Sequence, residues 1–146
     1  LMTLNVGTKA PDIDYITPDG EETSIIKGGK ETWVIFIPFA FTGVCTSELC
    51  DIRDNPNNYL TTQRDVVLVS CDSAPSQIAW VEMNGFKGSM VSDFYPHGLI
   101  SKNYDNFNED LGCSNRTSYL VGTNGDILKV LEAEELGKQR DLTQYA

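Results

Sequence analysis

The sequence predicts an α/β layered fold with a central mixed β-sheet flanked by helices. Two continuous apolar runs of β-forming residues, 33–37 and 66–70, indicate buried central strands. A helical pattern follows each run, and a hairpin signal follows later in the chain. Repeated strand–helix units of this kind place the two central strands parallel, joined by right-handed crossovers.

An N-terminal β-hairpin is expected before the first central strand. Residues 12–16 alternate polar and apolar side chains, and residues 23–26 can form the returning strand. Between them, Pro18, Asp19 and Gly20 form a strong turn signal. The hairpin therefore adds a small antiparallel unit ahead of the central sheet.

The remaining expected elements complete the order of a thioredoxin-like sheet. First come a segment from Thr42 to about Tyr59, which is helical at its start and which Pro56 limits or kinks, and a helix from Pro75 that stops at Gly85. A short strand at 90–92, a turn at 95–98 and a short helix at 99–104 follow. The chain ends with a hairpin of 118–121 and 127–130 around Asn124 and Gly125, and with an amphipathic helix over 132–145 interrupted by Gly137. The length of 146 residues suits one domain, residues 1–146.

Composition and charge exclude several classes of partner. Acidic residues outnumber basic ones by 21 to 11, and the net charge of −10 argues against nucleic acid and acidic membranes. No apolar run is long enough to span a bilayer, and the N-terminus has no secretory signal, so a cytoplasmic location is expected. The four cysteines lack the spacing of a small secreted scaffold and are expected to be free or redox-active thiols.

The chemistry is expected where the first central strand ends at Pro38 and a helix begins near Thr42. Ligands bind beyond the carboxyl ends of the strands in open α/β sheets. Cys45 falls in the first turn of that helix, where unpaired N–H groups and the positive end of the helix dipole favour a thiolate. A thiolate attacks the O–O bond of a peroxide and becomes a sulfenic acid, while nearby N–H groups stabilise the developing charge. The Thr42 hydroxyl can reach the sulfur or cap the helix, and Pro38, which has no N–H, can shield the sulfur from water.

At this point the sequence resembles the peroxiredoxins. Pro38, Thr42 and Cys45 reproduce the family motif Pro-x-x-x-Thr/Ser-x-x-Cys. Residues 7–12 resemble the family's opening hairpin, and residues 92–98 resemble the alkyl hydroperoxide reductase E subgroup of actinobacteria. The resemblance implies a thioredoxin-like fold and the reduction of hydrogen peroxide, organic hydroperoxides and peroxynitrite by thiols.

The resemblance also assigns roles to two charged residues. Asn115, Arg116 and Thr117 resemble the family's arginine position, which implies that Arg116 contacts the thiolate and the peroxide. A guanidinium stays charged and offers several donors to the leaving oxygen. Glu48, one turn after Cys45, resembles a glutamate that orients this arginine. From the residues alone, a surface arginine in an ion pair and a solvated helix carboxylate remain open alternatives.

Cys50 departs from the E-type subgroup, which usually relies on one cysteine. Its spacing from Cys45 resembles the bacterioferritin-comigratory subgroup, in which the second cysteine resolves the sulfenic acid as an intramolecular disulfide. Residues five apart on a helix have Cα atoms about 8–9 Å apart, whereas a disulfide requires less than about 7 Å. The start of the helix must therefore unwind for this bridge to form. Packing as a small buried hydrophobe is the alternative for Cys50.

The other thiols and the single histidine receive no catalytic role. Cys71 is expected to pack at the end of a strand, Cys113 to lie in a polar loop as an incidental or exposed thiol, and His97 to lie in a turn. No metal or other cofactor is expected. The expected partners are a peroxide, a reducing thiol protein (thioredoxin, a glutaredoxin-like protein or mycoredoxin) and, from the resemblance, a second copy in a homodimer.

Three other functions remain open at this stage. A thioredoxin-type disulfide oxidoreductase would carry Cys-x-x-Cys at the start of the helix, and this chain has four residues between its two cysteines. A peroxide sensor or relay would use the same chemistry at Cys45. An interaction module with inert thiols would not need an activated sulfur.

Overall fold

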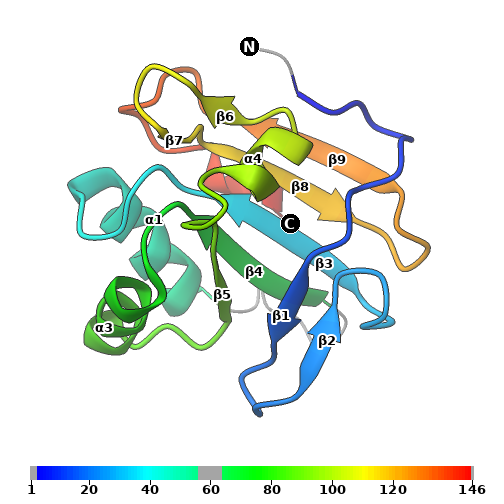
Figure 1. Ribbon diagram of the computed structural model, residues 1–146, viewed down its shortest axis with the longest axis horizontal. Helices are drawn as coiled ribbons and strands as arrows, with labels where there is room; N and C mark the ends of the chain where they lie inside the picture. The colour runs from blue at the N-terminus through cyan, green and yellow to red at the C-terminus, as the bar shows by residue number, and fades with distance from the viewer. Residues whose placement is uncertain (1–2, 56–63, 146) are drawn as a thin grey trace.

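The computed structural model describes residues 3–55 and 64–145 (Figure 1). Of the segment predicted from Thr42 to about Tyr59, the helix at its start ends at Asp54, whereas Pro56 and the residues up to Tyr59 lie outside the described residues. Within the described ranges, none of the helices combines the length and the apolar character needed to cross a bilayer.

The central sheet contains five strands in the order β5-β4-β3-β8-β9. The strands β3 (Glu31–Phe36), β4 (Arg64–Ser70) and β5 (Ser89–Ser92) are parallel, whereas β8 (Thr117–Val121) and β9 (Ile127–Glu132) are antiparallel to their neighbours. The predicted mixed sheet with parallel central strands is therefore confirmed.

The helices and the N-terminal hairpin follow the predicted order, apart from the C-terminal tail. Two short strands, at 107–108 and 113–114, have no counterpart in the sequence prediction. Their bounds are β1 Asp14–Ile16, β2 Glu22–Ser24, α1 Gly43–Asp54, α3 Ala74–Asn84, α4 Leu99–Asn103, β6 Phe107–Asn108, β7 Cys113–Ser114 and the 3-10 helix η1 Leu142–Tyr145. Two glycines act as the sequence indicated. Gly85 ends α3 in a left-handed conformation with φ 64°, and Gly125 adopts φ 88° in the turn between β8 and β9.

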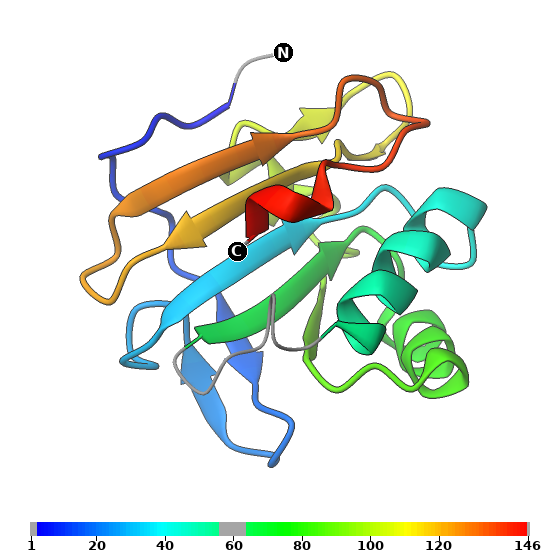
Figure 2. The same cartoon turned by 180° about the vertical axis from the view of Figure 1, so that it is seen from behind.

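Alternating side chains of β3 divide the core between two faces of the sheet. Trp33, Ile35 and Ile37 pack with α1, α3 and Tyr145 of η1, whereas Val34 and Phe36 pack with the N-terminal segment, the β1–β2 hairpin and α4. Figure 2 shows η1 and α1 on the first face, and Figure 1 shows the hairpin and α4 in front of the second. This alternation follows from the period of two in a β-strand.

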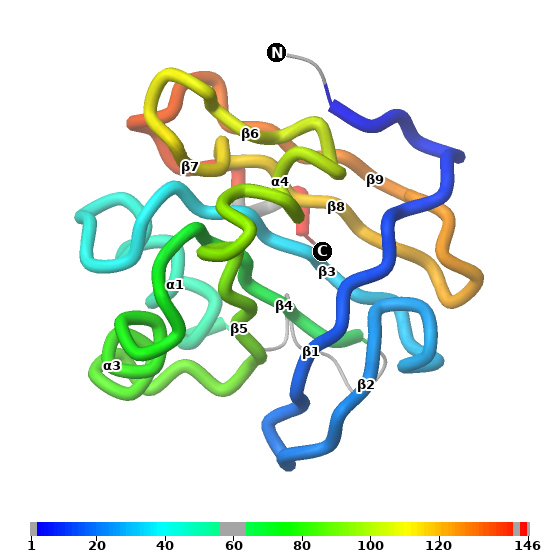
Figure 3. Tube along the Cα trace, viewed as in Figure 1, coloured from blue at the N-terminus to red at the C-terminus, as the bar shows by residue number. Residues whose placement is uncertain are grey.

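The N-terminal segment lies beside the β8–β9 hairpin, as can be followed in Figure 3, and hydrogen bonds hold it there. Lys9 and Asp126 form an isolated antiparallel β-bridge, and the backbone N–H of Gly7 donates to the carbonyl of Ile127 at 2.8 Å. The two ends of the described chain thus both pack on the β3–β8–β9 half of the sheet.

The predicted amphipathic helix over residues 132–145 is wrong. Strand β9 continues to Glu132, and the segment that follows is irregular until η1. Its backbone groups bond to distant parts of the chain: the N–H of Ala133 donates to the Arg116 carbonyl at 3.0 Å, and the N–H of Arg140 donates to Glu48 Oε2 at 3.1 Å. A continuous helix over 132–145 would have used the N–H of Arg140 internally.

Candidate active site

Cys45 lies just after the loop that connects β3 to α1. The loop is held by two hydrogen bonds, from the N–H of Ile37 to the Val69 carbonyl at 3.0 Å and from the N–H of Ala40 to Asp72 Oδ2 at 2.8 Å. Helix α1 begins at Gly43, so Cys45 is its third residue. Its N–H is among those that have no acceptor inside the helix, as the sequence predicted.

The side chain of Cys45 is enclosed. The residue is 0% exposed and belongs to an apolar cluster that includes Ala40, Leu49 and Trp80. Pro38 is buried as well. The sulfur is therefore shielded from bulk water in this conformation, and a substrate reaches it only when neighbouring side chains move.

Thr42 takes the N-cap position of α1 but does not cap the helix. Its backbone is extended, with φ −96° and ψ 154°, and its side chain makes no capping hydrogen bond. The hydroxyl instead donates to the Phe39 carbonyl at 2.8 Å, within the loop. The predicted capping bond is thus replaced by a local bond that tightens the loop before the helix.

Glu48 and Arg116 form a buried ion pair. Arg116 Nη1 lies 2.7 Å from Glu48 Oε1, and the two side chains are 4% and 3% exposed. Arg116 Nε also donates to the Leu136 carbonyl at 2.6 Å. The alternatives of a surface arginine and a solvated carboxylate are therefore wrong. Because Glu48 lies three residues after Cys45 on α1, the pair holds the guanidinium against the helix that carries the thiol.

A second arginine, Arg140, completes this cluster, and no sequence pattern identified it as a site residue. Its Nε donates to Glu48 Oε2 and its Nη2 to Glu48 Oε1, both at 2.9 Å. The planar fork of the guanidinium matches a carboxylate in this bidentate way. Arg140 comes from the irregular C-terminal segment, and its residue pattern suggested a helix rather than an inward-facing side chain.

The Arg140 guanidinium also ties β8 and η1 to the cluster. Its Nη1 donates to Ser118 Oγ at 2.9 Å, and that oxygen lies 2.7 Å from the Tyr145 hydroxyl. The Tyr145 ring packs edge-on against Trp33, with ring centroids 4.8 Å apart. The cluster therefore joins α1, β8 and the C-terminal turn in one buried network.

The buried cluster of Glu48, Arg116 and Arg140 carries more positive than negative charge. Burial raises the pKa of the Glu48 carboxyl, but hydrogen bonds and charge from Arg140, together with the charge of Arg116, lower it below its ordinary value. Burial also opposes the charge of Arg140, yet Tyr145, Glu48 and Cys45 raise the pKa of its guanidinium. The carboxylate and the two guanidinium groups alone sum to one positive charge. A thiolate at Cys45 would balance it, since an uncompensated buried charge is costly.

Cys50 lies on the same helix but faces another neighbour. Its Sγ lies 3.8 Å from Asn84 Oδ1 at the end of α3, and the residue is half-buried. Cys45 and Cys50 are both free, and α1 is continuous between them. The predicted need for unwinding therefore applies to this structure, since a regular helix keeps the two Cα atoms too far apart for a disulfide.

Two predictions on the remaining residues agree with the structure, and one is wrong. Cys71 is buried at the end of β4, and His97 lies in a turn, 2.7 Å from the Gly112 carbonyl through Nε2. Cys113, however, is 0% exposed in β7 rather than in a polar loop. The short β6–β7 ladder turns it inward, and burial, with Cys71 and Cys45 nearby, raises the pKa of Cys113 to about 11.

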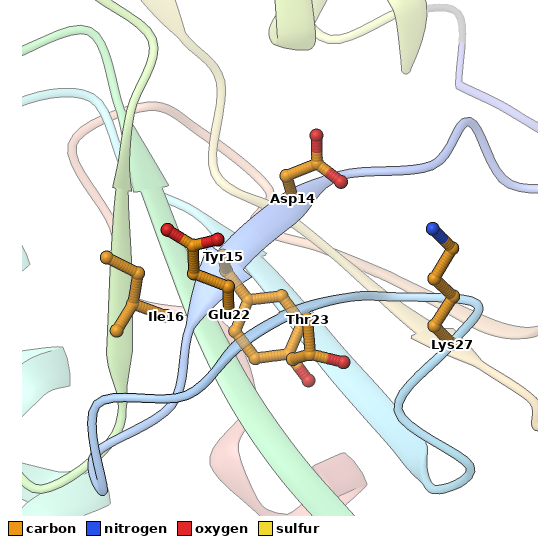
Figure 4. Close-up of a pocket in the computed structure, with 6 residues that line it drawn as sticks. All are labelled: Asp14, Tyr15, Ile16, Glu22, Thr23 and Lys27. Atoms are coloured by element: carbon orange, nitrogen blue, oxygen red, sulfur yellow. The ribbon is translucent and has the colours of Figure 1, made fainter.

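A separate pocket lies on the N-terminal hairpin. It has a volume of about 550 Å³, and Figure 4 shows the six side chains that line it, which all belong to residues 14–27. None of these residues belongs to α1 or to the charged cluster. The pocket is therefore distinct from the Cys45 site.

Comparisons with known proteins identify the family. The profile of the AhpC/TSA family matches residues 6–130. Alkyl hydroperoxide reductase E of Mycobacterium tuberculosis is 33% identical over 140 residues, which cover 94% of this chain and 91% of that protein.

Solved structures agree with the fold. The structure of Enterococcus faecalis AhpC is 28% identical, with a TM-score of 0.79 over 98% of this chain and 88% of that one. Peroxidoxin BcpB from Mycobacterium tuberculosis has the same fold, with a TM-score of 0.78 and 21% identity over 99% of this chain and 92% of that one. With a thioredoxin-like sheet and a buried cysteine at the start of α1, the chain belongs to the AhpC/TSA family of peroxiredoxins and is a thiol peroxidase.

Proposed function

We propose that this protein reduces hydrogen peroxide, organic hydroperoxides or peroxynitrite through a sulfenic acid on Cys45. The observation that carries the proposal is the buried cluster of Glu48, Arg116 and Arg140, with its excess of one positive charge, which packs against the helix that carries Cys45 through Glu48. The relative named alkyl hydroperoxide reductase E supports organic hydroperoxides as substrates.

In the first step the Cys45 thiolate attacks one oxygen of the peroxide. The O–O bond breaks, an S–O bond forms, and the other oxygen leaves as hydroxide or alkoxide and takes up a proton. Arg116 and the free N–H groups in the first turn of α1 stabilise the charge on the leaving oxygen. Pro38 keeps water from the sulfur. The Thr42 hydroxyl leaves the Phe39 carbonyl and turns toward the reacting atoms.

In the second step Cys50 resolves the sulfenic acid. The Cys50 sulfur attacks the Cys45 sulfur, an S–S bond forms, and the hydroxyl group leaves as water. The first turns of α1 unwind for this step, and Cys50 leaves its contact with Asn84. A thiol protein, which is thioredoxin, a glutaredoxin-like protein or mycoredoxin, then reduces the disulfide by exchange.

We further propose a cytoplasmic homodimer. Four aromatic side chains near the site are exposed, namely Phe39, Phe41, Phe94 and Tyr95. Their two loops meet at Asp72, which accepts from the Ala40 N–H through Oδ2 and from the Ser92 hydroxyl through its carbonyl. Adjoining exposed aromatic residues of this kind are typical of protein interfaces. The four free thiols suit a reducing compartment.

Stopped-flow fluorescence tests the first step. Trp80 packs in the same cluster as Cys45 and donates to the Thr46 hydroxyl at 3.1 Å, so its emission reports changes at the start of α1. Wild type and Cys50→Ser should both show a fast phase that is first order in peroxide, and Cys45→Ser should show none.

Mass spectrometry of the same samples tests the second step. Wild type should accumulate a Cys45–Cys50 disulfide at one equivalent of peroxide, whereas Cys50→Ser should form no such bridge and should accumulate more highly oxidised Cys45 only when peroxide is in large excess. Fast oxidation in Cys45→Ser at the wild-type rate would overturn the assignment of the nucleophile. A wild-type product without the Cys45–Cys50 bridge would overturn the role of Cys50 alone.

A further inference from the structure

Three of the four thiols gather at the carboxyl ends of the central strands, although only one takes part in the chemistry above. Cys71 follows β4, Cys113 lies in β7, and Cys45 begins α1, and all three are buried. Burial and then the neighbouring Cys71 and Cys45 raise the pKa of the Cys113 thiol, whereas the charge of Arg116 opposes that rise. Cys113 is thus an electrostatic neighbour of the site thiol on one side and of Cys71 on the other.

The surroundings of Cys71 connect it to the strand that carries Cys113. Its Sγ lies 3.9 Å from Asp93 Oδ2, and the same oxygen accepts from the Ser101 hydroxyl at 2.7 Å. The Ser101 hydroxyl lies 2.6 Å from that of Ser114, the residue next to Cys113 in β7. Burial and the charge of Asp93 raise the pKa of the Cys71 thiol, and hydrogen bonds with the hydroxyl and the backbone of Ser114 oppose that rise. A carboxylate and two hydroxyl groups therefore hold Cys71 against β7.

Cys50 lacks such a position in the folded protein. It is directed to Asn84 on α3, and it reaches Cys45 only after α1 unwinds. Cys113 belongs to a different segment, which the ion pair of Arg116 and Glu48 already holds against α1. A route through Cys113 therefore does not require the helix to open.

We propose that Cys71 and Cys113 form a second redox pair, which accepts oxidation from Cys45 while α1 stays folded and stores it as a buried Cys71–Cys113 disulfide. The inference rests on the proposed formation of a sulfenic acid at Cys45. The Cys71–Cys113 pair is then a second dithiol site in addition to the peroxide site at Cys45. It operates in parallel with the route through Cys50.

The transfer balances in two exchanges. In the first, the Cys113 sulfur attacks the Cys45 sulfenic acid, an S–S bond forms, the S–O bond breaks, and the hydroxyl group leaves as water with the Cys113 proton. In the second, Cys71 gives its proton to the Asp93 carboxylate, and its sulfur attacks Cys113. The Cys45–Cys113 bond breaks and Cys45 leaves as a thiolate.

The direction of the second exchange has a physical basis. Thiol–disulfide exchange is faster when the leaving sulfur is the more stable thiolate. Cys45 leaves at a helix N-terminus beside an excess of positive charge, whereas burial raises the pKa of both Cys71 and Cys113. Exchange therefore returns Cys45 to its reactive form and leaves the disulfide on the buried pair.

The tryptic map of the chain makes the test direct. Cleavage after lysine and arginine places Cys45 in peptide 31–53, Cys71 in peptide 65–87 and Cys113 in peptide 103–116. The full-length Cys50→Ser protein is treated with one equivalent of hydrogen peroxide, alkylated under denaturing conditions and digested without reduction. The expected product is a cross-link between peptides 65–87 and 103–116.

Two matched variants locate the source and the intermediate. Cys45→Ser with Cys50→Ser should give no cross-link at the same peroxide concentration, because the oxidation enters through Cys45. Cys50→Ser with Cys71→Ala should trap the cross-link between peptides 31–53 and 103–116. The main test changes only the half-buried Cys50, so it does not depend on the stability of variants in the core.

The outcomes separate this proposal from the peroxidase function. If Cys45 is rapidly oxidised in Cys50→Ser while Cys71 and Cys113 are both fully alkylated, the second redox pair does not exist and the peroxidase function stands. An equal cross-link without Cys45 would also overturn the transfer. If Cys45 is not oxidised rapidly, the peroxidase proposal itself fails.

Discussion

The two faces of the central sheet bury polar groups in different ways. The face that packs against α1 contains a carboxylate and two guanidinium groups, with Glu48, Arg116 and Arg140 at most 5% exposed. The opposite face buries mainly hydroxyl groups, such as that of Tyr119, which donates to the Tyr104 carbonyl at 2.8 Å. The Asp93 carboxylate is also buried, beside α4, where it accepts from the N–H and the hydroxyl of Ser101 rather than from a guanidinium group. Buried charges are costly to maintain, and they are common where a protein must control ionisation at a reactive group. The difference between the faces therefore marks the one on which the chemistry takes place.

The largest expected effect comes from removing the Glu48 carboxylate from the face that packs against α1. Glu48→Gln leaves two guanidinium groups buried without a counter-charge, and breaking a buried pair in this way costs about 3–5 kcal/mol. Urea denaturation at neutral pH measures the loss. A change below about 1 kcal/mol would be expected only of an exposed ion pair and would contradict the cluster described here.

The pH dependence of stability should differ between wild type and Glu48→Gln. The pKa of Glu48 is lowered in the folded state, so its contribution is fully present above the pKa of an unfolded glutamate, about 4.3. That contribution is lost as the pH falls through the lower folded value. The difference in the free energy of unfolding between the two proteins should therefore be constant from pH 7 to about 5 and shrink below about 4. A difference in the free energy of unfolding that grows on acidification would contradict a lowered pKa of Glu48 in the folded state.

The smallest effect is expected on the face opposite to α1. Tyr119→Phe removes one buried hydroxyl donor and leaves the Tyr104 carbonyl without it, which costs about 1–3 kcal/mol at most. The rate of Cys45 oxidation should not change, because Tyr119 belongs to the core cluster on the far side of the sheet. Stopped-flow fluorescence and urea denaturation of the same sample check both parts. A large loss of rate would mean that the two faces are coupled.

The sequence predicted most of the fold because local patterns decide it. The apolar runs of β3 and β4, the turn at Gly125 and the stop at Gly85 each appear within a few residues of the element they specify. Arg116 and Glu48 could be named only from the resemblance to a family, because nothing near them in the chain shows that they meet across 68 residues.

Arg140 and the C-terminal segment could not be predicted for the same reason. Residues 132–145 have a pattern suited to a helix, but the Arg140 backbone and side chain bond to Glu48, 92 residues away. Tertiary contacts of this kind override local helix preference. The burial of Cys113 has a similar cause, because it depends on the pairing of β7 with β6 and on the arrangement of the central strands.

The rate of Cys45 oxidation in Arg116→Met tests the central claim most directly. With Cys50→Ser as the common background, the account predicts a fall in the second-order rate constant of about 10²–10³-fold, the usual cost of removing a donor to a developing oxyanion. Arg116→Lys keeps the charge but loses the planar guanidinium, so its rate constant should lie between those of the background and of Arg116→Met. Circular dichroism should show that all three proteins are folded. A rate constant for the folded Arg116→Met protein within threefold of its background would contradict the claim that this guanidinium activates the sulfur.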